Sequence, residues 1–150
     1  TSEGHKKIGE FLQQEWEKNL NVKVKLENQE WKTYLANRYE GNFQVARAGW
    51  VGDYLDPNTF LDMFIKGAGM NGGNYSNNEY DSLINKAARM EPGAARFETL
   101  QKAENILVND DMAVMPFYYY VTLNMIDLNK WGGWHTNTMD YHPTKDIYLK

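Results

Sequence analysis

The first part of the chain alternates between helical and extended patterns of apolar residues. One helix is predicted over about residues 4–19, where apolar side chains recur every three or four positions: Ile8, Phe11, Leu12 and Trp16. Residues 22–26 alternate Val and Leu with Lys, which is typical of a half-buried strand. Asn28 can cap a second helix that should end near Gly41, and residues 43–49 resemble a second short strand. Strand, helix and strand in this order predict a βαβ unit with a parallel pair.

The rest of the chain predicts further helices and one long apolar stretch. Asp56 and Pro57 suit a helix start, with Asp as the cap and Pro in the first turn. Apolar stripes at helical spacing indicate two more helices, around residues 80–87 and 97–107. Residues 112–125 are dense in apolar and aromatic side chains. With no internal repeat or linker, we expect one α/β domain over the whole 150 residues.

Composition excludes several classes of function. Hydrophobic residues make up 42% and charged residues 24%, as in an ordinary globular domain. The net charge is −4 and the basic residues are scattered, which argues against a nucleic-acid partner. Cysteine is absent, so disulfides, thiolate metal sites and Cys nucleophiles are excluded. Aromatic residues reach 14%, which suits a binding surface, although most aromatic side chains fill cores.

Three patterns that could carry chemistry have weak support. Residues 67–72 match G-x-G-x-x-G, but they do not lie between a strand and a helix, as a dinucleotide site requires. His135, Asp140 and His142 do not have the spacing of a zinc site. No catalytic constellation is recognisable, and a hydrolase with paired carboxylates is only a remote alternative. We therefore expect no cofactor, no metal and no enzymatic activity.

Aromatic and charged residues gather around the expected end of the second strand, where open α/β sheets bind ligands: Trp31, Arg38, Arg47, Trp50, Asp53 and Tyr54. Gly49 and Gly52 have no side chain, so a ligand backbone could approach the main chain closely. A carboxylate suits an ammonium group, and a guanidinium suits a carboxylate. A ligand with both groups is a peptide. The alternative, left open by these residues, is a local Arg47–Asp53 salt bridge on a solvated rim.

Several motifs, in one order over essentially the whole chain, resemble the C-terminal lobe of bacterial oligopeptide-binding proteins, the solute-binding components of ABC importers. They are residues 28–33 (NQEWKT), 46–54 (ARAGWVGDY), 80–84 (YDSLI), 103–104 (AE) and 116–120 (PFYYY). The resemblance implies one lobe of a type II periplasmic-binding-protein fold, with a mixed, mainly parallel sheet flanked by helices. The chain begins at a Thr and stops in a strand-like run, so we expect a fragment of a larger two-lobed protein.

The resemblance also implies roles for residues. Asp53 matches the carboxylate that binds the peptide's N-terminal ammonium group. The main chain of Gly49, Trp50 and Val51 matches the segment that pairs with the peptide like an added strand. Trp31 and Trp50 match aromatic walls of side-chain pockets, and Arg38 and Arg47 match basic groups near the peptide's carboxylate; Tyr54 belongs to the matching motif. Val51 and Gly52 differ from the residues of some relatives, which leaves the shape of the pocket there open.

The expected function is that of the substrate-binding component of an oligopeptide ABC importer. Its expected partners are an oligopeptide, a second lobe of the same protein and the membrane subunits of the importer. The expected location is extracytoplasmic, in the periplasm or lipid-anchored at the outer face of the cell membrane. The same scaffold could instead bind dipeptides, signalling peptides or a nickel chelate, and a sensory or adhesive protein that reuses the lobe is a third possibility.

Overall fold

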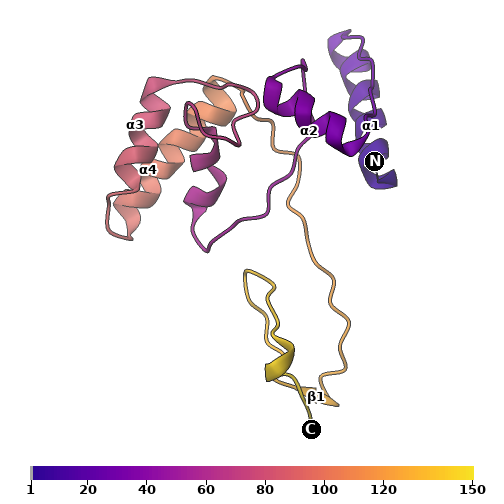
Figure 1. The fold of residues 1–150 in the computed structure, drawn as a ribbon, viewed down its shortest axis with the longest axis vertical. Coiled ribbons are helices and arrows are strands. Elements are labelled where there is room, and N and C mark those ends of the chain that lie inside the picture. Colours follow the sequence, from indigo (N-terminus) through magenta and orange to yellow (C-terminus); the bar gives the residue numbers. More distant parts are fainter. Residues whose placement is uncertain (1) are drawn as a thin grey trace. The chain divides into compact units, whose positions relative to one another are not determined.

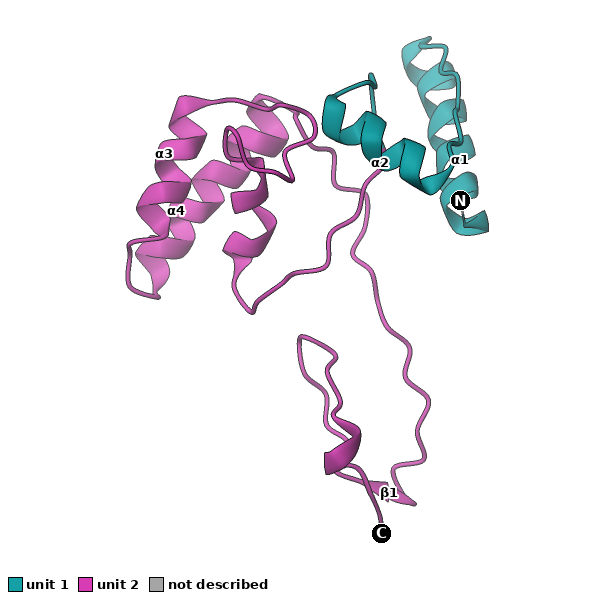
Figure 2. Cartoon of the chain, in the orientation of Figure 1, with its two compact units in different colours: residues 1–46 teal, residues 47–150 magenta. Residues whose placement is uncertain are grey.

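The computed structural model describes residues 2–150. The chain divides into two compact units, unit 1 (Thr1–Ala46) and unit 2 (Arg47–Lys150), coloured separately in Figure 2. Each unit is built mainly from helices and loops, as Figure 1 shows. None of the helices within residues 2–150 is both long and apolar enough to cross a membrane.

Unit 1 consists of two capped helices. Helix α1 (Glu3–Leu20) begins where the Ser2 hydroxyl accepts a hydrogen bond from a main-chain N–H, and it ends at Asn21 in the left-handed conformation. Helix α2 (Trp31–Glu40) begins at Glu30, whose carboxylate accepts two main-chain N–H groups, and ends at Gly41 with φ 73°. Both predicted helices are confirmed. The cap of the second is Glu30 and not Asn28, because the helix begins at Trp31 and the Glu30 carboxylate accepts two free amides of its first turn.

The two predicted strands in the first third of the chain are wrong for this structure. Residues 22–26 and 43–49 are not β-strands, and within residues 2–150 the sheet is one antiparallel pair. The expected parallel pair of a βαβ unit is therefore not formed. A strand exists only when a neighbour accepts and donates its main-chain hydrogen bonds. Here residues 22–26 lie along α1 instead: Gln13 Nε2 donates to the Val24 carbonyl at 2.6 Å.

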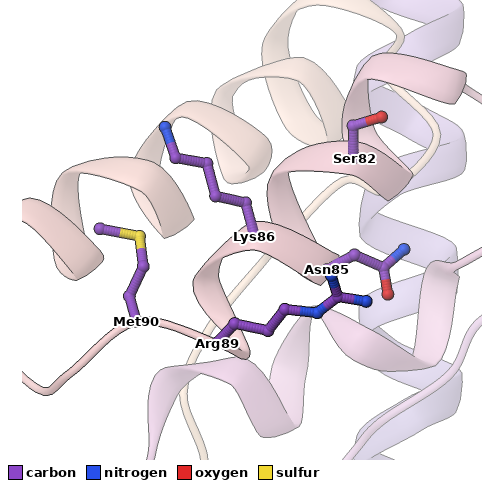
Figure 3. Close-up of a pocket in the computed structure, with 5 residues that line it drawn as sticks. All are labelled: Ser82, Asn85, Lys86, Arg89 and Met90. Carbon is purple, nitrogen blue, oxygen red and sulfur yellow. The ribbon is translucent and has the colours of Figure 1, made fainter.

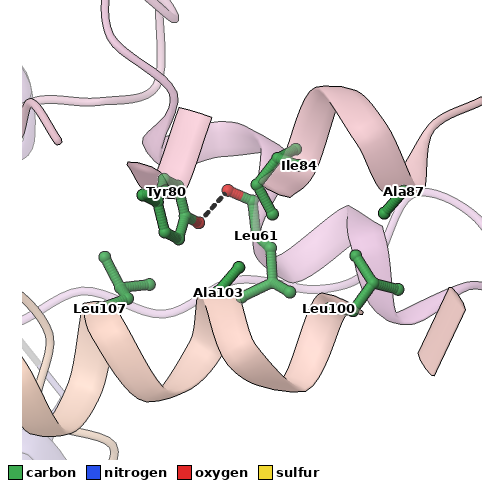
Figure 4. Close-up of a cluster of buried hydrophobic side chains, with 7 residues drawn as sticks. All are labelled: Leu61, Tyr80, Ile84, Ala87, Leu100, Ala103 and Leu107. Atoms are coloured by element: carbon green, nitrogen blue, oxygen red, sulfur yellow. Dashed lines mark hydrogen bonds between the residues drawn. The ribbon is translucent and has the colours of Figure 1, made fainter. Parts of the chain in front are cut away.

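Unit 2 is organised around a pair of helices, α3 (Asn78–Ala87) and α4 (Ala94–Asn105), which pack side by side. The second continues as a short π-helical segment, η3 (Ile106–Asp110). Both helices were predicted and are confirmed. Their apolar stripes form the core together with one residue of the preceding loop (Figure 4): Leu61, Tyr80, Ile84, Ala87, Leu100, Ala103 and Leu107.

The helix predicted after Asp56 is replaced by two short 3-10 turns, η1 (Pro57–Phe60) and η2 (Asp62–Phe64). Asp56 is the cap, as predicted, and accepts the N–H of Asn58 at 2.9 Å. Leu61 lies between the two turns with φ −113°, and its main-chain carbonyl accepts the Tyr80 hydroxyl at 2.6 Å. This buried hydrogen bond attaches the turns to the core.

The glycine-rich residues 67–72 belong to a loop held by one buried amide. Asn71 is 7% exposed, and its side chain bonds both main-chain groups of Tyr75, accepting at 3.0 Å and donating at 2.7 Å. The side-chain nitrogen also lies 3.3 Å from the Phe64 carbonyl and 3.2 Å from that of Ile65. Residues 67–72 are thus part of a loop held by Asn71, and Gly67 adopts a positive φ of 80° that favours glycine.

The end of unit 2 is extended and then forms the small sheet. The apolar stretch at residues 112–125 has no regular secondary structure, and Tyr119 and Met125 are 93% and 101% exposed. Strands β1 (Trp131–Gly132) and β2 (Tyr148–Leu149) pair antiparallel, with a short turn η4 (Thr144–Asp146) before the second strand. The mixed, mainly parallel sheet is thus not formed within residues 2–150.

Candidate functional site

Six of the eight predicted site residues lie on one continuous segment at the start of unit 2: Arg47, Gly49, Trp50, Val51, Asp53 and Tyr54. The main chain in its first part could form hydrogen bonds with an added strand. Within residues 2–150, the main chain of residues 49–51 makes no hydrogen bond to other main chain, and Val51 is 82% exposed. An extended segment with unpaired N–H and C=O groups can accept another strand.

Asp53 is exposed, and its main chain is anchored by η1. The Asp53 N–H donates to the hydroxyl oxygen of Thr59 at 3.0 Å, and Thr59 is 2% exposed. The carboxylate is thus presented to solvent from a fixed main chain. Gly52 permits this close approach: a Cβ there would lie 3.0 Å from the Thr59 methyl and 3.2 Å from the Phe60 ring. Gly52 therefore has an internal packing role.

Arg47 contacts an aromatic pair from the distant residues 116–120. Its guanidinium donates to the Tyr120 hydroxyl and lies 6.0 Å from the centre of that ring. The rings of Tyr118 and Tyr120 are 4.9 Å apart. A hydrogen bond from Tyr118, helped by the charge of Arg47, lowers the pKa of Tyr120 below its ordinary value. Among residues 2–150 the structure records no Arg47–Asp53 ion pair, so the local salt bridge is not formed.

The polar group of Tyr54 is hydrogen-bonded within residues 2–150, and that of Trp50 is not. The Tyr54 hydroxyl donates to Asp62 at 2.6 Å and accepts from Asn58 at 3.1 Å. Burial and the Asp62 carboxylate raise the pKa of Tyr54. The indole Nε1 of Trp50 is buried and has no acceptor among the described residues. Tyr54 thus has a structural role in holding η1 and η2, beside any role toward a ligand.

Trp31 and Arg38 lie on α2, in unit 1. Trp31 is 65% exposed and stacks on Tyr34, with ring centres 5.4 Å apart. The Arg38 guanidinium lies 5.8 Å from the ring centre of Tyr39. Trp31 therefore presents an exposed aromatic face, and both residues have a local aromatic neighbour.

An ion pair that the sequence did not reveal fixes the turn after Asp53. Two guanidinium nitrogens of Arg96 donate to the two carboxylate oxygens of Asp56, at 2.7 and 2.9 Å. These hydrogen bonds hold the pKa of Asp56 below its usual value, although burial opposes the shift. Sequence identified Asp56 only as a helix cap. Its partner stands 40 positions further along, and no local pattern indicates the pairing.

His142, in the C-terminal segment, has local structural contacts. His142 lies 2.9 Å from the Asp140 carboxylate, and its ring stacks on Trp134 with centres 3.6 Å apart. The hydrogen bond with His142 lowers the pKa of Asp140. Within residues 2–150 no three His, Cys, Asp or Glu side chains converge as metal ligands would.

A hollow on the surface of unit 2 does not coincide with the predicted site. It is open to solvent, has a volume of about 650 Å³, and is lined by side chains of α3 and the turn that follows it (Figure 3): Ser82, Asn85, Lys86, Arg89 and Met90. All five come from one short stretch, so one helix forms the wall and none of the eight predicted site residues takes part. The candidate site is therefore the open segment at residues 47–54.

Comparison with known proteins gives consistent matches. Residues 1–72 match the family described as bacterial extracellular solute-binding proteins, family 5 Middle. The periplasmic oligopeptide-binding protein OppA of Salmonella typhimurium is 39% identical over 150 residues, which are 100% of this chain and 26% of that protein. The chain thus spans about a quarter of the length of that relative.

Solved structures agree with the sequence matches. OppA of Burkholderia pseudomallei superimposes with a TM-score of 0.83 at 34% identity, over 100% of this chain and 29% of that one. OppA of Haemophilus influenzae, in complex with RPPGFSPFR, gives 0.82 at 33% identity, over 99% and 29%. The predicted fold class, a lobe of a type II periplasmic binding protein, is confirmed by these neighbours, although the sheet within residues 2–150 is small. The chain is thus similar over its whole length to part of an oligopeptide-binding protein, and its residues 1–72 match the extracellular solute-binding proteins of family 5.

Proposed function

We propose that this chain is the peptide-contacting lobe of a two-lobed oligopeptide-binding protein that serves an ABC importer. One observation carries the proposal: the main chain of residues 49–51, which makes no main-chain hydrogen bond within residues 2–150, leads directly to the exposed residue Asp53. A peptide added to this segment as a strand would be held through its own backbone. Such binding is largely indifferent to side chains, as a general peptide carrier requires.

Asp53 would bind the N-terminal ammonium group of that peptide. A carboxylate forms short, charge-assisted hydrogen bonds with an ammonium group. The Asp53 main chain is held by the Thr59 hydroxyl at 3.0 Å, so the carboxylate needs little reorganisation to meet the ligand. The side chain is exposed here, and closure of a second lobe would remove water and strengthen the ion pair.

The remaining predicted residues offer aromatic and basic groups to a peptide, from each unit separately. Trp50 and the exposed face of Trp31 are suited to line side-chain pockets, because aromatic rings offer large contact areas. Arg47 would meet the peptide's carboxylate end together with Tyr120, the partner that its guanidinium contacts. Arg38 is a second basic group for short peptides. The second lobe and the membrane subunits of the importer are the proposed partners, at an extracytoplasmic location, either periplasmic or lipid-anchored.

The test compares Asp53→Ala with the unchanged two-lobed protein by calorimetry, using trialanine as ligand. We expect the affinity to fall by about 3 kcal/mol or more, about a hundredfold, because the substitution leaves a buried ammonium group unpaired in the closed cleft. The control is Glu79→Ala, which removes an exposed carboxylate from the first turn of α3. Unchanged affinity in Asp53→Ala would refute this assignment, and a protein that binds no peptide would refute the proposed function itself.

A further inference from the structure

Arg96 is the centre of a cluster that joins the turn after Asp53 to both helices of the core. Its two terminal nitrogens bond the two oxygens of Asp56 at 2.7 and 2.9 Å, and its Nε donates to the Ala87 carbonyl at 3.0 Å. The Arg96 side chain is 12% exposed and that of Asp56 27% exposed. All three guanidinium nitrogens of Arg96 thus donate hydrogen bonds at the same time, which requires the planar group that only Arg has.

The position of Arg96 in its helix supports a role outside that helix. Arg96 is the third residue of α4, which begins at Ala94 after a Gly93 cap. The N-terminal turn of a helix carries partial positive charge, so a cation there is unfavourable for the helix. The bonds that Arg96 makes to Asp56 offset this cost. They hold the loop that contains Asp56 against α4.

A short path of hydrogen bonds connects Asp56 to Asp53. Asp56 begins η1, and its carbonyl accepts the Thr59 N–H at 3.2 Å. The Thr59 hydroxyl then accepts the Asp53 N–H at 3.0 Å. Thr59 is 2% exposed and cannot replace these partners with water. The main chain of Asp53 is therefore fixed by η1, and η1 is fixed at its first turn by Arg96.

We propose that Arg96 is a positioning residue for recognition of the ligand's N-terminal ammonium group, acting through Asp56 and Thr59 on Asp53. This inference rests on the proposed function. Loss of the Arg96–Asp56 pair should let η1 shift and move Asp53 away from the ammonium group. Backbone pairing at residues 49–51 lies before this turn and should be affected less.

The test is the ratio of affinities for trialanine and N-acetyl-trialanine, measured on the two-lobed protein. Only the first peptide carries an ammonium group, so the ratio reports how well Asp53 is placed and is insensitive to a general loss of binding. We expect Arg96→Met and Asp56→Asn to lower the ratio about tenfold, since a charge-assisted hydrogen bond depends steeply on geometry. Arg89→Met is the matched control, because Arg89 is an exposed Arg in the turn after α3, and it should leave the ratio unchanged.

Arg96→Lys keeps the charge but cannot bond both oxygens of Asp56 and the Ala87 carbonyl with one planar group. It should lower the ratio by about threefold and keep the far-ultraviolet circular dichroism of the folded protein, which covers the case in which Arg96→Met does not fold. Amide hydrogen exchange at Asp53 should become faster in these variants, while the amides of α3 stay protected.

The outcomes separate this inference from the proposed function. If Asp53→Ala removes the preference for trialanine while Arg96→Met and Arg96→Lys retain it, the positioning role is refuted and the proposed function stands. If Arg96→Met weakens both peptides equally, the residue is structural only and the inference is refuted. If Asp53→Ala retains the preference, the assignment of Asp53 fails, and the inference fails with it.

Discussion

The Tyr80 hydroxyl provides a sensitive test of how the core holds the turns η1 and η2, which follow the candidate site. Tyr80 is 0% exposed, and its hydroxyl donates to the Leu61 carbonyl at 2.6 Å (Figure 4). Burial raises the pKa of Tyr80 well above its ordinary value, so the hydroxyl remains a donor throughout the neutral range. Its ring packs edge-on against Tyr75, with centres 5.4 Å apart. Tyr80→Phe removes the donor and keeps the ring.

The structure sets the size of the effect. A buried acceptor left without any partner costs about 1–3 kcal/mol. The Leu61 carbonyl also accepts the Phe64 N–H at 3.0 Å, so one hydrogen bond survives the substitution. The retained ring leaves no cavity of the kind that makes large-to-small substitutions costly. We therefore expect Tyr80→Phe to destabilise unit 2 by about 1–2 kcal/mol, in the lower part of the range.

The measurement is native-state amide hydrogen exchange in α3 and α4. This method reports the opening free energy of one region, which suits a chain with two compact units. A loss of one to two kcal/mol should speed exchange by about 5–30-fold. The matched control is Tyr119→Phe, because Tyr119 is 93% exposed and its change should stay within about 0.5 kcal/mol. Equal exchange rates in the two variants would refute the reasoning.

Two further predictions concern the loops of unit 2. Asn71→Ala should destabilise the glycine-rich loop by about 2–3 kcal/mol, because it leaves both main-chain groups of Tyr75 without their partners at 2.7 and 3.0 Å. Faster exchange of the Tyr75 amide would confirm this, and an unchanged rate would contradict it. Asp56 has a pKa lowered mainly by hydrogen bonds from Arg96, so its stabilising effect is complete above the unfolded value of about 4 and is lost as pH falls through the folded pKa. Thermal unfolding over a series of acidic pH values should show this loss, and Asp56→Asn should reduce its slope; equal slopes would disprove the linkage.

The sequence was sufficient for features that depend on neighbouring residues. The helices α1 to α4 follow from apolar spacing and from end signals such as Gly41. Helix formation uses hydrogen bonds between residues four apart, so local sequence contains most of the information. The motif at residues 46–54 likewise indicated the family, and comparison with known proteins confirmed it.

Strands could not be predicted in the same way. Residues 22–26 and 43–49 have the composition of strands, yet neither is a strand in this structure. Alternating apolar residues show only that an extended segment can bury one face. Whether it becomes a strand depends on a partner elsewhere, and the sequence of the segment does not name that partner.

The candidate site also combines features that are local in the sequence with contacts between distant residues. Asp53, and the open main chain that leads to it, could be recognised from residues 46–54 alone. The partners that hold this segment come from far along the chain: Arg47 contacts Tyr120, 73 positions away, and Asp56 pairs with Arg96, 40 positions away. Many Arg and Asp residues could form such pairs on charge alone. For Asp56 and Arg96, the packing of the turns η1 and η2 against α3 and α4 decides the pairing, because a largely buried guanidinium must have its hydrogen bonds made within the protein.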